Sequence, residues 1–411
     1  MNNPESKTDE KPMPLEGIRV VEYAVFHAGP GAGAILADLG AEVIKVENDG
    51  GDPVRQWTLI GNVEAALSDG QSIWHQISNR NKKAIYLDIK KEQGRRIFHK
   101  LIKEADVFLT NLRKSTKEEL GLDYAAISRV NPKIIHASVS GFGPEGSAGD
   151  IGAFDPLGQA RTGMMYATGS QEPALFNFGV LDQSTAIAAS HSILTALLVR
   201  ERKGIGQEVH ISLLSTGLWL MYGNMMMIAG LGRDPNVGWS RLDNSPLRNR
   251  FRCKDGKWIM STHHPEGRYW PSFCEATGQT ALLKDSRFFK EADRQANCRD
   301  LVYIFDKVFA TKTCDEWMEI FEERGLMFSP VQHSIDLFQD PQALINNYLV
   351  DFDHPVMGKI KIPGYPAHFS ANQAGTRTAA PAIGEHTSQI LKEMGYQDEE
   401  IEKLKEEKVI K

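Results

Sequence analysis

Runs of β-branched and aliphatic residues alternate along the first half of the chain with amphipathic segments of helical spacing. The apolar runs are bounded by glycine, asparagine or charged residues, which predicts strands at 18–24, 42–47, 84–88, 106–110, 133–139 and 208–214. Apolar residues at helical spacing predict helices at 92–104 and 183–200. Strands that alternate with helices in this way are typical of an α/β fold with a parallel sheet.

The pattern changes after about residue 232. A strand pair is expected around the turn Lys254-Asp255-Gly256, and short helices rich in Trp, Phe and Cys follow it. We therefore predict a large domain that begins with 14–232, a smaller α+β middle domain at 233–330, and a return to the large domain at 331–411. The apolar window 217–231 is too short for a membrane span and predicts a buried helix.

Composition narrows the possible functions. The chain has 411 residues, of which 41% are hydrophobic and 24% charged, as is ordinary for a globular protein. Its formal net charge of −6 argues against a nucleic-acid partner. The four cysteines are not spaced as metal ligands, so no metal site is predicted. The first 14 residues are polar and unlike a signal peptide, and we expect a cytoplasmic protein with no membrane partner.

A glycine-rich segment follows the first predicted strand. Gly29, Gly31 and Ala34 precede a short helical run at 34–39, and Glu47 ends the second strand, which loosely matches a dinucleotide-binding fingerprint. One interpretation is therefore a nicotinamide-dependent oxidoreductase. Pro30, however, lacks the N–H group that a phosphate would need there. In the other interpretation, the small residues allow close packing of helix and strand.

Several short motifs occur in one order along residues 14–396, and together they resemble the class III CoA-transferases, the formyl-CoA and carnitine CoA-transferase superfamily. The motifs include residues 14–22, Ala28-Gly29-Pro30, residues 36–47, Asn81-Lys82-Lys83, Asn111-Leu112, residues 138–143, Gly204-x-Gly206-Gln207 and residues 384–387. The resemblance implies a Rossmann-type large domain built from both chain ends, a smaller middle domain and an interlocked homodimer. It implies acyl-CoA and a carboxylic acid as substrates, with no tightly bound cofactor.

The resemblance also assigns residues. The nucleophilic aspartate of such enzymes lies just before the long helix, at the position of Asp182. Its carboxylate would attack an acyl-CoA thioester and pass through an aspartyl anhydride and an aspartyl-CoA thioester. Taken without the resemblance, the spacing favours a helix N-cap role for Asp182 over a catalytic one. The nearby Asp155 is expected to be structural.

Other positions follow from the same resemblance. His27 and Ala28 fall in a segment that lines the active site, and His27 is either a donor to a substrate carboxylate or an ordinary polar loop residue. The CoA chain would meet Asn111, Leu112 and Phe142. The phosphates would meet Lys82 and Lys83, whose alternative is a solvated turn.

The chain also departs from its relatives. Asn48 and Glu119 stand where arginines often hold the adenosine end of CoA, and Arg113, Lys114 or Lys117 would have to replace them. The superfamily includes α-methylacyl-CoA racemases, which place a histidine where this chain has Phe154. Because phenylalanine cannot transfer a proton, the racemase is the second alternative. Some relatives pair two homologous subunits, so a homologous partner subunit is a further possibility.

The acceptor acid is not specified by any motif. Tryptophan and methionine residues in and before the middle region, among them Trp258 and Trp270, suit an apolar or aromatic acid. As a set, however, these residue types are more often part of a hydrophobic core.

Overall fold

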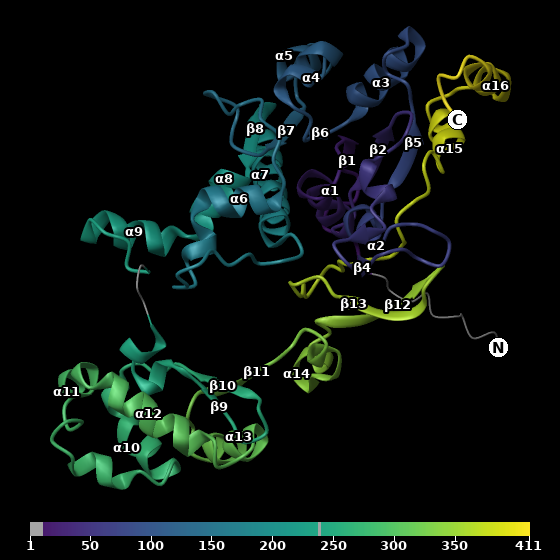
Figure 1. The fold of residues 1–411 in the computed structure, drawn as a ribbon. Helices are drawn as coiled ribbons and strands as arrows, with labels where there is room; N and C mark the ends of the chain where they lie inside the picture. Colours follow the sequence, from purple (N-terminus) through teal and green to yellow (C-terminus); the bar gives the residue numbers. More distant parts are fainter. Residues whose placement is uncertain (1–10, 237–239) are drawn as a thin grey trace, which may run out of the picture. The chain divides into compact units, whose positions relative to one another are not determined.

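The computed structural model describes residues 11–236 and 240–411, which form two compact units. Unit 1 contains the chain up to Met165, Ala174–Ala229 and Asn347–Lys411, and unit 2 contains Tyr166–Pro173 and Gly230–Asn346. Both ends of the chain therefore belong to unit 1, and unit 2 is built mainly from the middle of the sequence (Figure 1).

Unit 1 is built on a six-stranded parallel sheet with the order β5-β2-β1-β6-β7-β8. Its strands are β1 (Arg19–Tyr23), β2 (Glu42–Glu47), β5 (Lys83–Tyr86), β6 (Val107–Thr110), β7 (Ile135–Ser140) and β8 (Gln207–Ser212). In chain order this arrangement is 3-2-1-4-5-6, in which the strand order reverses between β1 and β6. The predicted α/β fold with a parallel sheet is confirmed.

Helices cover both faces of this sheet. The α-helices that lie wholly within unit 1 are α1 (Ala28–Asp38), α2 (Ile73–Asn79), α3 (Glu92–Glu104), α4 (Lys114–Leu120), α5 (Tyr124–Val130), α6 (Asp155–Thr162), α7 (Val180–Lys203), α8 (Leu213–Leu220), α15 (Thr387–Glu393) and α16 (Asp398–Glu406). Successive side chains of β1 point to opposite faces of the sheet. Val20 packs under α1 and α7 on one face, and Val21 packs under α3 and α5 on the other.

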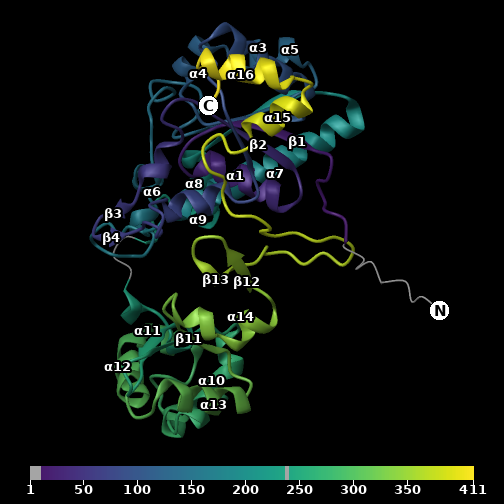
Figure 2. The same ribbon diagram turned by 90° about the vertical axis from the view of Figure 1, so that its right-hand side faces the viewer.

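The C-terminal helices complete one of these faces. Ile390 and Leu391 of α15 and Leu404 of α16 join the same core cluster as Phe98 of α3. Figures 1 and 2 both show α15 and α16, in yellow, beside the helices of the first half of the chain. Unit 1 also carries two hairpins, β3 (Leu59–Ile60) with β4 (Val63–Glu64) and β12 (Leu349–His354) with β13 (Gly358–Pro363).

The glycine-rich segment is helical rather than a turn that precedes a helix, which corrects the predicted helix start at residue 34. Helix α1 begins at Ala28, and Pro30 is accommodated because it lies in the first helical turn. The glycines meet protein atoms: a Cβ at Gly31 would lie 3.0 Å from that of Ala186 in α7, and one at Gly33 would lie 2.0 Å from Glu22. Close packing therefore accounts for these small residues.

Unit 2 has its own core and an antiparallel three-stranded sheet in the order β11-β10-β9. Its elements are β9 (Arg250–Arg252), β10 (Trp258–Ser261), α10 (Glu266–Ala276), α11 (Glu291–Ala296), α12 (Cys298–Phe309), α13 (Cys314–Glu323), β11 (Phe328–Val331) and α14 (Pro341–Ile345). Trp270 and Trp317 are buried among phenylalanines in this core. The tryptophan at 270 is thus a core residue and no candidate for contact with a substrate.

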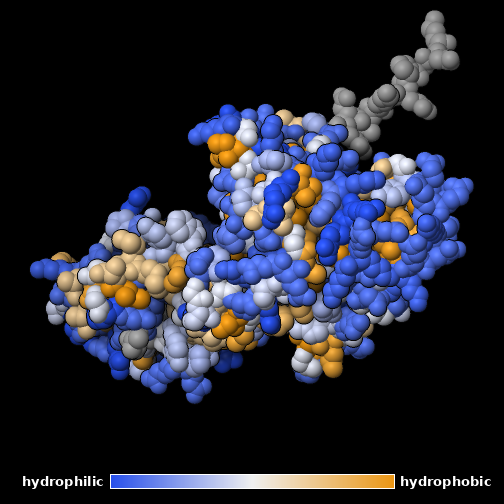
Figure 3. All heavy atoms as spheres, turned by 90° about the horizontal axis from the view of Figure 1, so that it is seen from above, coloured by the Kyte–Doolittle hydropathy of each residue, from blue (hydrophilic) through white to orange (hydrophobic). Residues whose placement is uncertain are grey.

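The apolar window 217–231 does not form one buried helix, which is a second correction. It contains the end of α8 and the whole of α9 (Tyr222–Leu231), and no residue of α9 is buried. Trp219, Tyr222 and Met226 are each more than half exposed. On the face of the molecule seen in Figure 3, apolar side chains likewise gather in separate patches among polar ones. Across residues 11–236 and 240–411, no helix is both long and apolar enough to span a membrane.

Candidate active site

The carboxyl ends of β1 and β6 meet where the strand order of the sheet reverses, the usual place for a ligand in such a fold. Asn111 follows β6 and joins the two loops at this point. Its amide nitrogen donates to the carbonyl of Val25 at 2.7 Å, and its amide oxygen accepts from the Val25 N–H at 2.9 Å. This pair of hydrogen bonds fixes the turn that leads into α1.

A cavity of about 850 Å³ opens beside these loops, within the range of small-molecule sites. Five of the residues proposed from the sequence line it, namely His27, Ala28, Asn111, Leu112 and Asp182. Phe142 is not among the lining residues, although the neighbouring Gly141 is. The Phe142 ring instead lies 4.4 Å from the guanidinium of Arg161.

Asp182 lies in the first turn of α7, but it is not the N-cap. The cap position belongs to Gly179, whose φ of 71° is left-handed, so the N-cap alternative for Asp182 is wrong. The first turn is capped from elsewhere, since Asp155 Oδ2 accepts from the N–H groups of Leu181 at 2.6 Å and Asp182 at 3.0 Å. Gln159 in turn donates to Asp155. Asp155 thus has the structural role expected of it.

The carboxylate of Asp182 lines the cavity and has no polar side-chain partner among the described residues. Among the described residues, no side chain donates a hydrogen bond to it and no cation pairs with it. Burial raises the pKa of Asp182 to about 7, and the negative charge of Asp155 adds to this effect. Perturbed carboxyl groups in cavities are typical of catalytic residues.

His27 is buried and lines the same cavity as Asp182. Its Nδ1 lies 2.6 Å from Ser78 Oγ, and its Nε2 lies 3.0 Å from the side-chain oxygen of Gln183. Burial lowers the pKa of His27 to about 4, so the ring is neutral near pH 7. Because both nitrogens already have partners, His27 orients Gln183 in this structure and has no spare nitrogen to move a proton.

Neither of the two lysines proposed for phosphate binding lines the cavity. Lys82 is fully buried and donates to Glu22 at 2.7 and 2.9 Å, to the carbonyl of Pro30 and to Asn79. Lys83 donates to Glu42 at 2.6 Å on the surface of the sheet. Both ammonium groups are therefore paired with carboxylates, which argues against a phosphate-binding role for either lysine.

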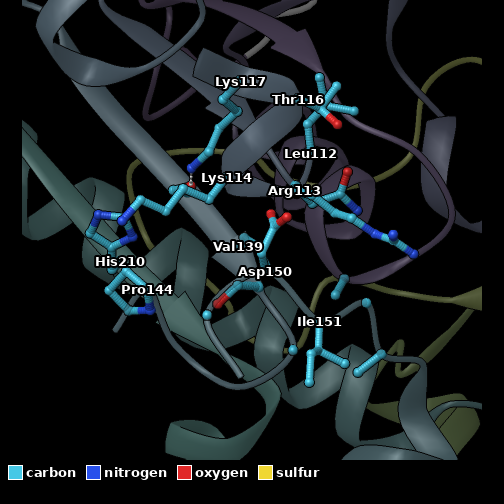
Figure 4. A pocket seen from close by; sticks show the side chains of 18 of the residues that line it. Leu112, Arg113, Lys114, Thr116, Lys117, Val139, Pro144, Asp150, Ile151 and His210 are labelled. Atoms are coloured by element: carbon cyan, nitrogen blue, oxygen red, sulfur yellow. Dashed lines mark hydrogen bonds between the residues drawn. The ribbon is translucent and has the colours of Figure 1, made fainter. Parts of the chain in front are cut away.

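Other cations do reach the cavity. Arg113, Lys114 and Lys117 line it from the start of α4, and no carboxylate within the described residues pairs with Arg113 or Lys114. In Figure 4 the side chains of Lys114 and Lys117 extend toward His210. Arg113 extends in the opposite direction in the same view. Lys117 is buried and donates a hydrogen bond to Ser138. Burial lowers the pKa of Lys117.

The two departures from the family pattern lie together. Asn48 and Glu119 line a second, smaller cavity of about 280 Å³, which shares Val25, Leu112 and Thr116 with the first. Its only lining cation among the described residues is Lys90. Across residues 11–236 and 240–411, no cluster of three side chains is suited to bind a metal ion.

Sequence reasoning missed the aromatic side chains around Asp182. Phe26, Phe154, Trp57 and Trp74 come from four segments, and their rings contact one another in turn, from Phe154 through Phe26 and Trp57 to Trp74. No spacing rule connects these positions. A hint lay in Phe154 alone, which directly precedes Asp155 and stands where a racemase would carry histidine.

Comparison with known proteins gives a consistent result over almost the whole chain. Residues 15–387 match the model of CoA-transferase family III. An acyl-CoA transferase of Fusarium pseudograminearum is 34% identical over 96% of this chain and 88% of its own length. The (R)-2-hydroxy-4-methylpentanoate CoA-transferase of Clostridioides difficile is 32% identical, over 97% of this chain and 100% of its own.

Solved structures agree with the sequence matches. The crystal structure of a CaiB/BaiF family protein from Brucella suis superposes with a TM-score of 0.81 at 27% identity. The superposition covers 93% of this chain and 100% of that one.

Proposed function

Because the chain belongs to CoA-transferase family III, and is a CoA-transferase, we propose that it moves coenzyme A from an acyl-CoA to a carboxylic acid through covalent intermediates on Asp182. The observation that carries this proposal is the isolated carboxylate of Asp182 at the cavity wall, with a pKa raised to about 7. A poorly solvated carboxylate without a cation is a stronger nucleophile than one held in an ion pair.

The proposed reaction has two symmetrical halves. Asp182 attacks the thioester carbonyl, the C–S bond breaks, and an aspartyl anhydride and the CoA thiolate result. The thiolate then attacks the aspartyl carbonyl and releases the donor acid as its carboxylate, which leaves an aspartyl-CoA thioester. The acceptor carboxylate repeats both steps in reverse, so one thioester replaces another and no net proton is consumed.

The cations of α4 support a site for the phosphates of CoA. Arg113 and Lys114 are exposed side chains on the wall of the cavity, so each is free to meet a phosphate by charge-assisted hydrogen bonds. Asn111 and Leu112 precede them and would follow the pantetheine chain. We propose that these cations take the place of the arginines that Asn48 and Glu119 replace.

The racemase alternative requires a second proton-transfer group across the cavity from Asp182. Phe154 is the cavity residue at the relevant position, and it carries no titratable proton. His27 is near, but both of its ring nitrogens are occupied. These observations favour transfer over racemisation.

We also propose that the chain works as a homodimer. Helix α9 and the end of α8 expose Trp219, Tyr222 and Met226, which are three and four residues apart in sequence, and a large exposed apolar surface usually marks an interface. Light scattering on the purified chain tests this, with a dimer expected and a concentration-independent monomer as the contrary result. The domain arrangement and interlocked dimer expected from the family remain part of this proposal.

The proposed activity is tested by incubating the protein with an acyl-CoA and a second carboxylic acid, and by following both CoA esters by chromatography. We expect the new CoA ester to form, with a loss of at least about a thousandfold in kcat for Asp182→Asn. Asp351→Asn, an exposed carboxylate on β12, is the matched control and keeps the activity. Exchange of the α-proton of a 2-methylacyl-CoA in D2O, without transfer, would instead establish the racemase.

A further inference from the structure

Four aromatic rings form a continuous group beside Asp182, which we call the aromatic wall. Phe26 lies at its centre, with ring centroids 4.9 Å from Phe154 and 5.9 Å from Trp57, both at edge-to-face angles. Trp74 continues the wall at 6.2 Å from Trp57. These separations are those of favourable aromatic pairs.

Two sets of contacts place the aromatic wall close to Asp182. Phe154 directly precedes Asp155, whose carboxylate holds the N–H groups of Leu181 and Asp182. On the other side, a Cβ built on Gly179 would lie 3.7 Å from the Trp74 ring and 3.8 Å from Cβ of Asp182. Trp74 and Asp182 therefore border the same small space, and Phe26 and Phe154 line the cavity with Asp182.

The wall is not part of a hydrophobic core. Phe154 is 51% exposed and Trp57 is 43% exposed, so two large rings remain open to solvent. Phe26 is held at a φ of 63°, a conformation that is costly for a residue other than glycine. Its N–H donates to Asp52 Oδ1 at 3.0 Å, which fixes this turn. Exposed rings on a strained, firmly held turn are typical of a binding surface.

The cations that could meet a second negative charge near the wall already have other partners or roles. Arg113 and Lys114 line the same cavity as Phe26 and Phe154, and the proposed function assigns both to the phosphates of CoA. The two cations whose charge reaches His27 beneath the wall are Arg80 and Lys82. Arg80 is paired with Asp38 and Lys82 with Glu22. With CoA bound to Arg113 and Lys114, a second carboxylate brought against the rings would lose its hydration without gaining a free cation, which is costly.

We propose that the aromatic wall is the acyl subsite, and that it selects monocarboxylic acids with an aryl or branched aliphatic body over dicarboxylic acids. This inference rests on the proposed function, because the acid must react at Asp182. An apolar acyl body would lie against Phe26 and Phe154 while its carboxyl carbon meets the aspartate.

The half-reaction from the acyl-CoA tests the wall directly. The protein is mixed with 3-phenylpropanoyl-CoA, 4-methylpentanoyl-CoA or glutaryl-CoA, trapped with hydroxylamine, and scored by mass spectrometry for the hydroxamate of Asp182. We expect the first two esters to label Asp182 at least about tenfold faster, as kcat/KM, than glutaryl-CoA. Equal or faster labelling by glutaryl-CoA would overturn the inference but leave the proposed function standing. No labelling of Asp182 by any ester would overturn both.

Two variants assign the preference to the wall. Phe154→Ala should lower labelling by 3-phenylpropanoyl-CoA about tenfold and labelling by acetyl-CoA much less, whereas Phe154→Leu should keep most of the preference. Phe289→Ala removes a phenyl ring in unit 2 that is 68% exposed, and it should change neither rate. An equal loss with both esters for Phe154→Ala would show a merely structural role and contradict the assignment.

Discussion

Two groups of carboxylates in unit 1 differ in whether a cation meets them. Beneath the turn that follows β1, Glu22 and Asp52 are fully buried, and each meets an ammonium group: Lys45 lies 3.2 Å from Glu22 and 2.9 Å from Asp52, and Lys82 lies 2.7 Å from Glu22. At the start of α7, Asp182 meets no cation among the described residues.

The paired group serves the fold. Asp52, besides pairing with Lys45, accepts the N–H groups of Phe26 and Val54, and Glu47 accepts the N–H of Asp52. Charges that are satisfied in this way hold the strained turn in place. The isolated carboxylate is unfavourable for the fold, because its charge is desolvated without compensation. The comparison teaches that a missing partner, more than burial, marks the reactive group.

The largest effect on stability should come from breaking the paired group. Lys82→Ala leaves Glu22 buried beside only one cation, and we expect the free energy of unfolding to fall by about 3 to 5 kcal/mol. Lys83→Ala is the matched control, since its pair with Glu42 is part-exposed and should contribute less than about 1 kcal/mol. Urea denaturation measures both. Equal losses would contradict the distinction between the two neighbouring lysines.

At the isolated carboxylate of Asp182, we expect a substitution to raise the free energy of unfolding rather than lower it. Asp182→Asn removes a charge that the folded state disfavours, so the variant should be more stable than the wild type by about 1 to 3 kcal/mol above pH 7. Because the folded pKa of Asp182 is raised to about 7, the wild type loses this stability as the pH rises from about 4 to about 7. The difference should therefore vanish near pH 4. Thermal unfolding across this range measures it, and a difference independent of pH would contradict the raised pKa.

The smallest expected effect on stability concerns Asp155. This residue both caps α7 and raises the pKa of Asp182. Asp155→Asn weakens the cap on α7, with an expected cost of about 1 to 2 kcal/mol. It also removes the negative charge that helps to raise the pKa of Asp182, so the pH midpoint of kcat/KM should move to lower pH. The pH profile of transfer measures this shift. A midpoint that moves upward would show that Asp155 acts on Asp182 by some route other than its charge.

The sequence predicted the strands and longer helices of unit 1 well, because their apolar periodicity is local. Helix α3 spans Glu92–Glu104 as expected, and β2 spans Glu42–Glu47. The start of α1 was missed because Gly29, Pro30 and Gly31 are typical of turns. Only tertiary packing against Ala186 and Asn111 explains why they are helical here.

The site was predictable only in part. The position of Asp182 followed from resemblance, but its raised pKa depends in part on the charge of Asp155, which is 27 residues away in sequence. Lys82 looked like a surface cation because its partner Glu22 is 60 residues away and in another strand. The aromatic wall is formed by residues of four separate segments, so no local sequence pattern predicts it. In each case the missing information was a contact between distant residues.

The measurement that tests the central claim most directly is a trap of the covalent intermediate. The protein is incubated with an acyl-CoA, treated with hydroxylamine and digested, and the peptide that contains Asp182 is examined by mass spectrometry. We predict a hydroxamate on Asp182 that is absent with free CoA and absent in Asp182→Asn. Active transfer with no label on this peptide, or with the label on another carboxylate, would contradict the account.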